Sequence, residues 1–218
     1  MSLKKIAVVL SGCGVLDGTE IHESVLTMLY LDQSNIDYQC FAPDCTQSEV
    51  INHLNNQLTD ESRNVLVESA RIARGNVKPI TELNINEFDG VICPGGFGAA
   101  KNLTNFSEVG DQFAIRSDVY DALKAFVDNN KPVGLLCIAP VMSGRLFPGS
   151  VKCTVGTDQE MMSVIRETGA SPVPCPVHDI VVDDVHKLVT TPAYMLAGRI
   201  SEAADGIRKL VDKVLEFA

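Results

Sequence analysis

Short apolar runs alternate with amphipathic segments along nearly the whole chain of 218 residues. The apolar runs, which we expect to be buried strands, cover residues 6–10, 38–42, 89–93, 133–136 and 152–155. Segments with helical spacing cover residues 20–31, 61–74, 118–129, 160–168 and 197–215. Residues 180–183 and 187–191 are expected to pair as a β-hairpin. Strands that alternate with helices need crossover connections, so the sequence predicts an α/β fold with a mostly parallel sheet.

The chain length indicates one domain that spans residues 1–218. This length is enough to bury a full core, and 45% of the residues are hydrophobic. No internal repeat and no linker rich in proline, glycine or serine divides the sequence. The segment 52–59 is the most irregular, and we expect an exposed excursion there.

Charge and hydropathy argue against a nucleic-acid or membrane partner. The formal net charge is −10, whereas binding to a phosphate backbone needs clustered lysine and arginine. The longest apolar runs, 6–10 and 133–138, fall far short of the ~20 residues that a membrane-spanning helix requires. The first run is also too short for a signal peptide, so we expect the chain to work in the cytoplasm.

Cys137 differs from the other six cysteines in its position. Those six, at positions 13, 40, 45, 93, 153 and 175, show no zinc-type spacing and are expected to be mostly buried thiols. Cys137 follows a fully apolar strand and precedes Ile138-Ala139-Pro140. A nucleophile on such a strand-to-helix turn lies above the sheet edge, where the helix N-terminus would favour the thiolate. A buried core cysteine is an equally good interpretation of the spacing alone.

Two further strand-end segments could meet Cys137 at the carboxyl edge of the sheet, where ligands bind. Gly95 and Gly96 directly follow a strand, and their N–H groups together with that of Ile138 could form an oxyanion hole. Glu23, near the start of the first helix, could point into the same crevice. A charged carboxylate would raise the pKa of the thiol, so Glu23 would have to be protonated and donate to the sulfur. A tight turn without a ligand and a solvated helix residue are the alternatives.

These motifs resemble the ThiJ/PfpI superfamily, which shares its sandwich with class I glutamine amidotransferases. The segments that carry this resemblance are the glycine loop 94–103, the nucleophile elbow 136–140, Glu23 at the acidic position and the strand end 190–193. Residues 11–18, 21–23, 63–66 and 174–177 resemble more closely the branch called enhancing lycopene biosynthesis protein, or ElbB. The resemblance covers nearly the whole chain.

The resemblance implies a flavodoxin-like three-layer α/β/α sandwich, a homodimer, and glyoxalase activity without glutathione, metal or other cofactor. Cys137 would be the nucleophile, Glu23 would move protons, and the N–H groups of Gly96 and Ile138 would hold the oxyanion. The secondary candidates for the site are His22, Cys13, Gly95 and Asn102. For Cys13 we favour a structural or gating role.

The histidines depart from the patterns of several relatives. Many relatives have a histidine in the strand after the elbow, but residues 152–158 contain none. His22 adjoins Glu23 but points about 100° away around the helix. The other histidines, at positions 53, 178 and 186, are expected at surface or structural positions. No histidine is followed two residues later by glutamate, and Ile138 stands where PfpI-type peptidases have histidine, which argues against glutaminase and peptidase activity.

The leading hypothesis is therefore a cysteine-dependent glyoxalase that converts glyoxal or methylglyoxal, both small 2-oxoaldehydes, to the 2-hydroxy acid. The alternative is a non-catalytic redox or stress sensor, or an accessory protein with an indirect link to isoprenoid metabolism. A lone activated cysteine can act as a switch through its sulfenic acid. Steady turnover of an aldehyde would distinguish the enzyme from the sensor.

Overall fold

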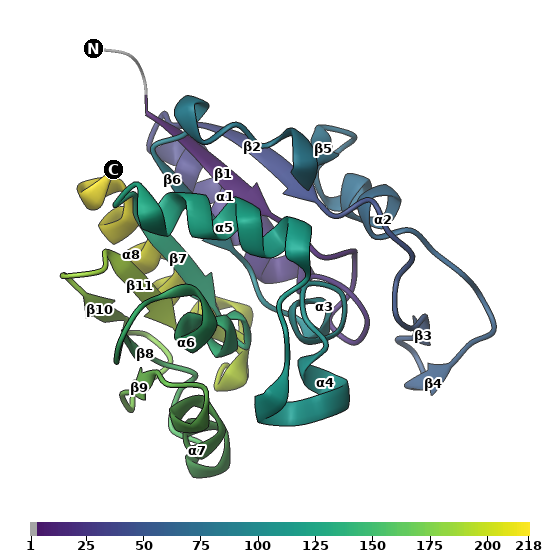
Figure 1. The fold of residues 1–218 in the computed structure, drawn as a ribbon. Helices are drawn as coiled ribbons and strands as arrows, with labels where there is room; N and C mark the ends of the chain where they lie inside the picture. The colour runs from purple at the N-terminus through teal and green to yellow at the C-terminus, as the bar shows by residue number, and fades with distance from the viewer. Residues whose placement is uncertain (1–3) are drawn as a thin grey trace.

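A seven-stranded sheet forms the middle layer of the protein, and the computed structural model describes residues 4–218. Its strands, in spatial order, are β10 (Val181–Asp183), β11 (Leu188–Thr191), β7 (Val133–Leu136), β6 (Gly90–Cys93), β1 (Lys5–Val9), β2 (Asp37–Ala42) and β5 (Val77–Pro79). β10 is antiparallel to β11, and the other pairs between these strands are parallel. The predicted α/β class with a mostly parallel sheet is confirmed (Figure 1).

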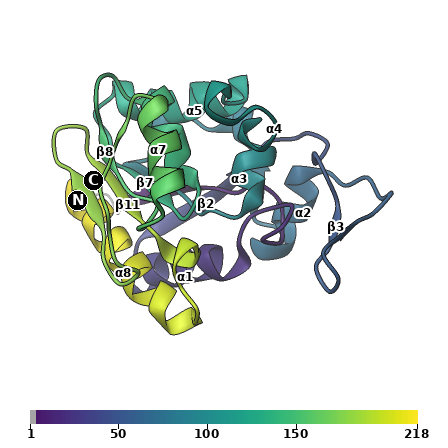
Figure 2. The same cartoon turned by 90° about the horizontal axis from the view of Figure 1, so that it is seen from below.

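Helices cover both faces of this sheet. One face carries α1 (Ile21–Gln33), α2 (Val65–Ile72) and α8 (Ile200–Phe217); the other carries α3 (Phe97–Lys101), α5 (Ser117–Asp128), α6 (Ser143–Leu146) and α7 (Gln159–Glu167). Figure 2 shows α1 and α8 on one side of the strands and α5 and α7 on the other, which is the three-layer sandwich that the resemblance implies. Within residues 4–218, no helix is both long and apolar enough to cross a membrane.

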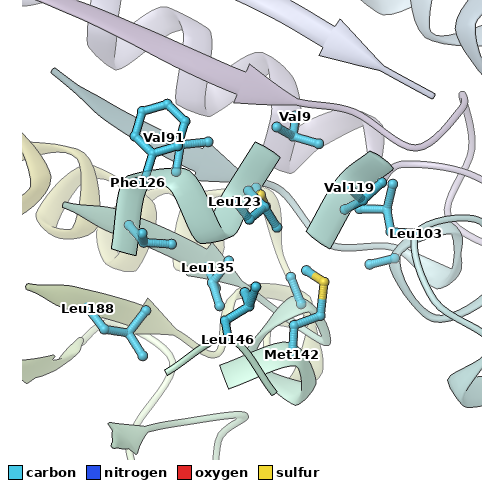
Figure 3. Packing of buried hydrophobic residues seen from close by; sticks show 14 of the residues in the cluster. Val9, Val91, Leu103, Val119, Leu123, Phe126, Leu135, Met142, Leu146 and Leu188 are labelled. Carbon is cyan, nitrogen blue, oxygen red and sulfur yellow. The ribbon is translucent and has the colours of Figure 1, made fainter. Parts of the chain in front are cut away.

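Both faces of the strands are buried, which explains why the strands are continuous apolar runs. Along β1, Ala7 and Val9 belong to the core under α5, whereas Ile6 and Val8 belong to the core under α1 and α8. The buried face of α5 presents Val119, Leu123 and Phe126 at helical spacing to the first core. Figure 3 shows these side chains packed near Val91 and Leu135 of the sheet. Full burial of each such side chain contributes ~1.5–3 kcal/mol of stability, and this contribution holds α5 against the sheet.

The order of the strands reverses beside β1. The chain passes from β1 to β2 and β5 on one side, and then crosses to β6, β7 and β11 on the other. Ligands bind in open α/β sheets at such a reversal, outside the carboxyl ends of the strands. The glycine loop that follows β6 and the cysteine that follows β7 both lie at this edge.

Several short elements differ from the sequence expectations. The expected strand 152–155 is only β8 (Lys152–Cys153), which pairs with β9 (Ser171–Pro172) in a separate two-stranded sheet. The irregular segment forms the hairpin of β3 (Ile51–Asn52) and β4 (Gln57–Leu58), which projects from the body (Figure 1). The remaining elements are α4 (Phe106–Val109) and 3₁₀ helices at Ile80–Glu82, Ile85–Glu87, Gly110–Gln112, Ala139–Met142 and Ala193–Met195. Segments this short have no periodicity from which they could be predicted.

Candidate active site

Cys137 lies on a sharp turn directly after β7. Its φ is +60°, a left-handed conformation that is rare for residues other than glycine. Its N–H donates to the carbonyl oxygen of Thr191 on the adjacent β11, at 3.0 Å. The side chain is 6% exposed. The turn thus holds the sulfur at the carboxyl edge of the sheet, as in a nucleophile elbow.

The thiol form of Cys137 is favoured in the free protein. Burial raises the pKa of the Cys137 thiol well above its ordinary value, and the neighbouring Glu23 raises it further. The N–H groups of Gly96 and Ile138 lie near the sulfur and act in the opposite direction. The element that follows is a 3₁₀ helix of four residues, too short for a large dipole. The N–H of Ile138 at the helix start lowers the pKa of the thiol as expected, but burial outweighs this effect.

Glu23 is fully buried in the first turn of α1, beside the Cys137 thiol. Its Oε2 accepts from the N–H of Gly95 at 2.8 Å, and its Oε1 accepts from the N–H of Tyr194 at 3.2 Å. Burial raises the pKa of the Glu23 carboxyl to about 7, Glu20 adds to this rise, and the hydrogen bonds oppose it. The carboxyl can therefore both take up and release a proton near neutral pH.

The start of α1 is tied to the turn after β6. Glu20 is the N-cap residue, and its carboxylate accepts from the N–H of Glu23 at 2.7 Å. The N–H of Glu20 in turn donates to the carbonyl oxygen of Gly95 at 3.0 Å. These two contacts fix Glu23 relative to the glycine turn, and the turn contacts Cys137.

Gly95 and Gly96 occupy positions where a side chain would not fit. A Cβ on Gly95 would collide with the Cβ of Cys137 and lie 3.0 Å from its sulfur. Gly96 has a φ of +88°, and its Cβ would lie 2.5 Å from the carbonyl oxygen of Gly18. Because the Gly95 N–H is bonded to Glu23, the N–H groups that converge on the sulfur are those of Gly96 and Ile138. Donors in this arrangement could also hold an oxyanion formed beside the sulfur.

The Cys137 side chain borders a cavity of about 390 Å³. Most of its lining is apolar and includes Val15, Phe97, Phe106, Met161, Tyr194 and Met195. These residues come from the loop after β1, from α3, α4 and α7, and from the turn after β11. Sequence reasoning did not find them, because isolated apolar residues in separate segments look like ordinary core positions. Only the resemblance of residues 190–193 pointed to the Tyr194 region.

Asn102 holds the loop 11–18 in place. Its Nδ2 donates to the carbonyl oxygens of Ser11 and Asp17, both at 2.9 Å, and its Oδ1 accepts from the N–H of Ser48. The side chain is buried and does not line the cavity. Its contacts are those of a structural residue.

His22 and Cys13 do not line the cavity either. The His22 Nδ1 lies 2.8 Å from the hydroxyl of Tyr194, and the ring is exposed. Cys13 is half-buried in the loop after β1; burial and then the charge of Glu68 raise the pKa of its thiol. No histidine of the described residues lines the cavity, and no three potential metal-binding side chains gather anywhere in residues 4–218.

Comparisons with known proteins agree with the fold and with the resemblance. No family model matches the chain. Human "Glutamine amidotransferase-like class 1 domain-containing protein 3, mitochondrial" is 43% identical over 223 residues, which cover 98% of this chain and 83% of that protein. The name of that protein places it in mitochondria, whereas we expect this chain in the cytoplasm, and the compartment of this chain stays a prediction.

Two solved structures extend the comparison. An isoprenoid biosynthesis protein with an amidotransferase-like domain from Ehrlichia chaffeensis is 38% identical, with a TM-score of 0.93, and the match covers 98% of this chain and 99% of that chain. A DJ-1 superfamily protein from Salmonella typhimurium is 16% identical, with a TM-score of 0.61, over 98% of this chain and 91% of that chain. The second match shows a shared fold.

Proposed function

The chain belongs to the class 1 glutamine amidotransferase-like family of the ThiJ/PfpI superfamily, in the branch of the isoprenoid biosynthesis proteins with an amidotransferase-like domain, and from this we propose that it is a cofactor-free, cysteine-dependent glyoxalase. It converts 2-oxoaldehydes such as glyoxal and methylglyoxal to 2-hydroxy acids. The observation that carries this proposal is the buried Glu23 carboxyl, with a pKa of about 7, beside the Cys137 thiol.

The first step joins the sulfur of Cys137 to the aldehyde carbon. The ionised Glu23 takes the thiol proton as the C–S bond forms, so a thiolate with an unfavourably high pKa need not accumulate. The electron pair of the C=O bond moves to oxygen, where the N–H groups of Gly96 and Ile138 stabilise the charge. Protonation of this oxygen by Glu23 gives a hemithioacetal.

The second step moves hydrogen within the bound substrate. Glu23, again ionised, removes the proton from the former aldehyde carbon to give an enediolate. The hydroxyl proton on that carbon moves to the neighbouring oxygen, and Glu23 then returns its proton to the neighbouring carbon. The product is a thioester of the 2-hydroxy acid, in which one carbon has been oxidised and the other reduced. Water then cleaves the thioester and releases the acid and the thiol, so the reaction needs no external oxidant or reductant.

Steady-state formation of lactate from methylglyoxal and of glycolate from glyoxal tests this proposal. Sustained turnover by the wild type that is lost in Cys137→Ala supports it. Cys175→Ala is the matched control, because Cys175 is also a buried thiol but does not line the cavity. Absence of turnover by a folded wild type, or equal turnover by Cys137→Ala, overturns the proposal.

A redox sensor is the second candidate, because no histidine of the described residues lies in the cavity beside Cys137. Peroxide sensing needs an accessible thiolate, however, and burial with a raised thiol pKa opposes this. Trapping of sulfenic acid in peroxide-treated protein tests the idea. Rapid modification of Cys137 without turnover of any aldehyde would favour the sensor.

A second copy of the chain is the partner that we propose. Ile21, Val25 and Leu29 are spaced by four residues along α1 and are all exposed, which places an apolar stripe on one helix face. Exposed apolar patches often mark protein interfaces. Mass measurements in solution should give a dimer for the wild type and a monomer for Val25→Glu.

A further inference from the structure

The cavity beside Cys137 is large for a small 2-oxoaldehyde. Its volume is about 390 Å³. At ~30 Å³ for a water-sized group, this is room for roughly a dozen such groups. Methylglyoxal has only a handful of non-hydrogen atoms and would leave most of this space to water. Cavities of this size usually bind larger ligands.

The lining of the cavity would hold that water poorly. Phe97, Phe106, Met161 and Met195 present apolar side chains, and none of the lining side chains in residues 4–218 is charged. The hydroxyl of Tyr194 already pairs with His22 at 2.8 Å. Water needs several polar partners in a confined space, so an apolar group of the substrate would fill this space more favourably.

Among residues 4–218, the cavity also offers no free cation to an anionic substrate. Lys101 lies over the ring of Phe97, but its Nζ is 2.7 Å from the Glu49 carboxylate and also donates to the carbonyl oxygen of Leu16. The partly ionised Glu23 beside Cys137 and the net charge of −10 would both repel an anion. These charges disfavour phosphorylated and carboxylated aldehydes.

The mouth of the cavity is apolar and open to solvent. Val15 and Phe97 line the cavity, yet their exposed fractions are 37% and 48%. A substituent long enough to leave the cavity would bury both side chains. The apolar surface therefore continues from the reactive sulfur to the mouth.

We propose that the substrate of this site is a 2-oxoaldehyde whose second carbon carries an uncharged, apolar alkyl or aryl substituent of roughly six or more carbon atoms. The inference rests on the proposed glyoxalase function and specifies its substrate class. The dicarbonyl group reacts at Cys137, while the substituent occupies the space between Phe106, Met161 and Met195 and extends toward Val15 and Phe97.

A homologous series of substrates tests this inference. The kcat/KM of the wild type should be measured for 2-oxoaldehydes with methyl, propyl, pentyl, heptyl and phenyl substituents. Each added methylene should raise kcat/KM about fourfold until the cavity is full. A series that is flat or falls with size, while methylglyoxal is turned over through Cys137, overturns the substrate class and leaves the glyoxalase proposal intact. No turnover of any member overturns the glyoxalase proposal itself.

A substitution at the cavity mouth provides a second test. Val15→Phe narrows the mouth, and the partly exposed side chain can change size without disturbing the core. It should lower the ratio of kcat/KM for the heptyl substrate to that for methylglyoxal by about tenfold. Val185→Phe is the matched control, because Val185 is an exposed valine that does not line the cavity. An unchanged ratio in Val15→Phe would overturn the proposed position of the substituent.

Discussion

The Glu23 carboxyl accepts a hydrogen bond of 2.8 Å from the N–H of Gly95, although 72 residues separate the two in the sequence. The bond joins the first turn of α1 to the turn after β6. It also occupies an N–H group that would otherwise be a third donor near the sulfur of Cys137. The residue proposed to carry protons is thus positioned by the same turn that supplies the Gly96 donor.

Glu23→Gln should lower kcat for methylglyoxal by ~10²–10⁴, because an amide cannot carry the proton that a general acid–base must transfer. The amide oxygen can still accept from Gly95, so the fold should be retained. Steady-state kinetics and circular dichroism measure the two effects. Glu82→Gln, an exposed glutamate remote from the cavity, is the control. Full activity in Glu23→Gln would contradict the mechanism.

The stability of the wild type should fall with rising pH relative to that of Glu23→Gln. The pKa of Glu23 rises from 4.5 to about 7 in the folded protein, so the folded state binds this proton more tightly than the unfolded chain. This contribution is complete below pH 4.5 and is lost as the pH rises through about 7. Between these two pH values, the free energy of unfolding of Glu23→Gln should rise by on the order of 2–4 kcal/mol relative to that of the wild type. Urea unfolding at a series of pH values measures the difference, and a constant difference would contradict the buried carboxyl.

Glu20→Gln should shift the acidic limb of the pH–rate profile to lower pH. The charge of Glu20 contributes to the raised pKa of Glu23, and its removal lowers that pKa. In the wild type, kcat/KM should rise with pH around 7, as Glu23 becomes the base that accepts the thiol proton. Glutamine keeps an oxygen for the helix cap, so α1 should still begin at the same residue. An unmoved midpoint would assign the titration to another group.

Gly96→Ala should be far more damaging than Gly75→Ala. Both glycines have a positive φ, +88° at Gly96 and +84° at Gly75, and the ψ of 161° at Gly96 places it in a region that essentially only glycine adopts. A Cβ at Gly96 also lies 2.5 Å from the Gly18 carbonyl oxygen, whereas nothing lies within 4 Å of a Cβ at Gly75. Thermal unfolding and turnover of both variants measure the contrast, and equal effects would contradict the tight packing of the Gly96 turn.

Asn102→Ala should destabilise the protein by about 2–3 kcal/mol, because it leaves the buried carbonyls of Ser11 and Asp17 without this partner. Denaturant unfolding measures this loss, and hydrogen exchange should locate it in the loop 11–18. Asn86→Ala, at an exposed asparagine, should stay within about 0.5 kcal/mol of the wild type. Loss of turnover without loss of stability would instead make Asn102 part of the chemistry.

The layers of the fold could be predicted because their central strands are continuous apolar runs. The strand expected at 6–10 is Lys5–Val9, and the one expected at 133–136 is Val133–Leu136. β5 could not be predicted, since its three residues include Lys78 and Pro79 and only its place at the sheet edge makes it a strand. For β8 the apolar pattern was present, but its burial comes from packing beside β10 and β11 rather than from pairing in the main sheet.

The polar part of the site was easier to anticipate than its apolar part. Glycines after a strand and a cysteine before proline carry a local signature, and they led to Gly96 and Cys137. The acid–base character of Glu23 depends on full burial, which only the assembled layers produce. Phe106 and Met161 come from different helices, and no local pattern relates them to each other.

The left-handed backbone of Cys137 sets the stability of the folded protein against the proposed catalytic role of this residue. A side chain at a φ of +60° strains the chain by roughly 1–2 kcal/mol, and glycine would relieve that strain. Cys137→Gly should therefore be more stable than Cys137→Ala, the reverse of their usual order in regular structure. Selection for stability alone would replace Cys137 with glycine. A laboratory evolution experiment that rewards only heat resistance should accordingly remove the thiol, and with it the reaction.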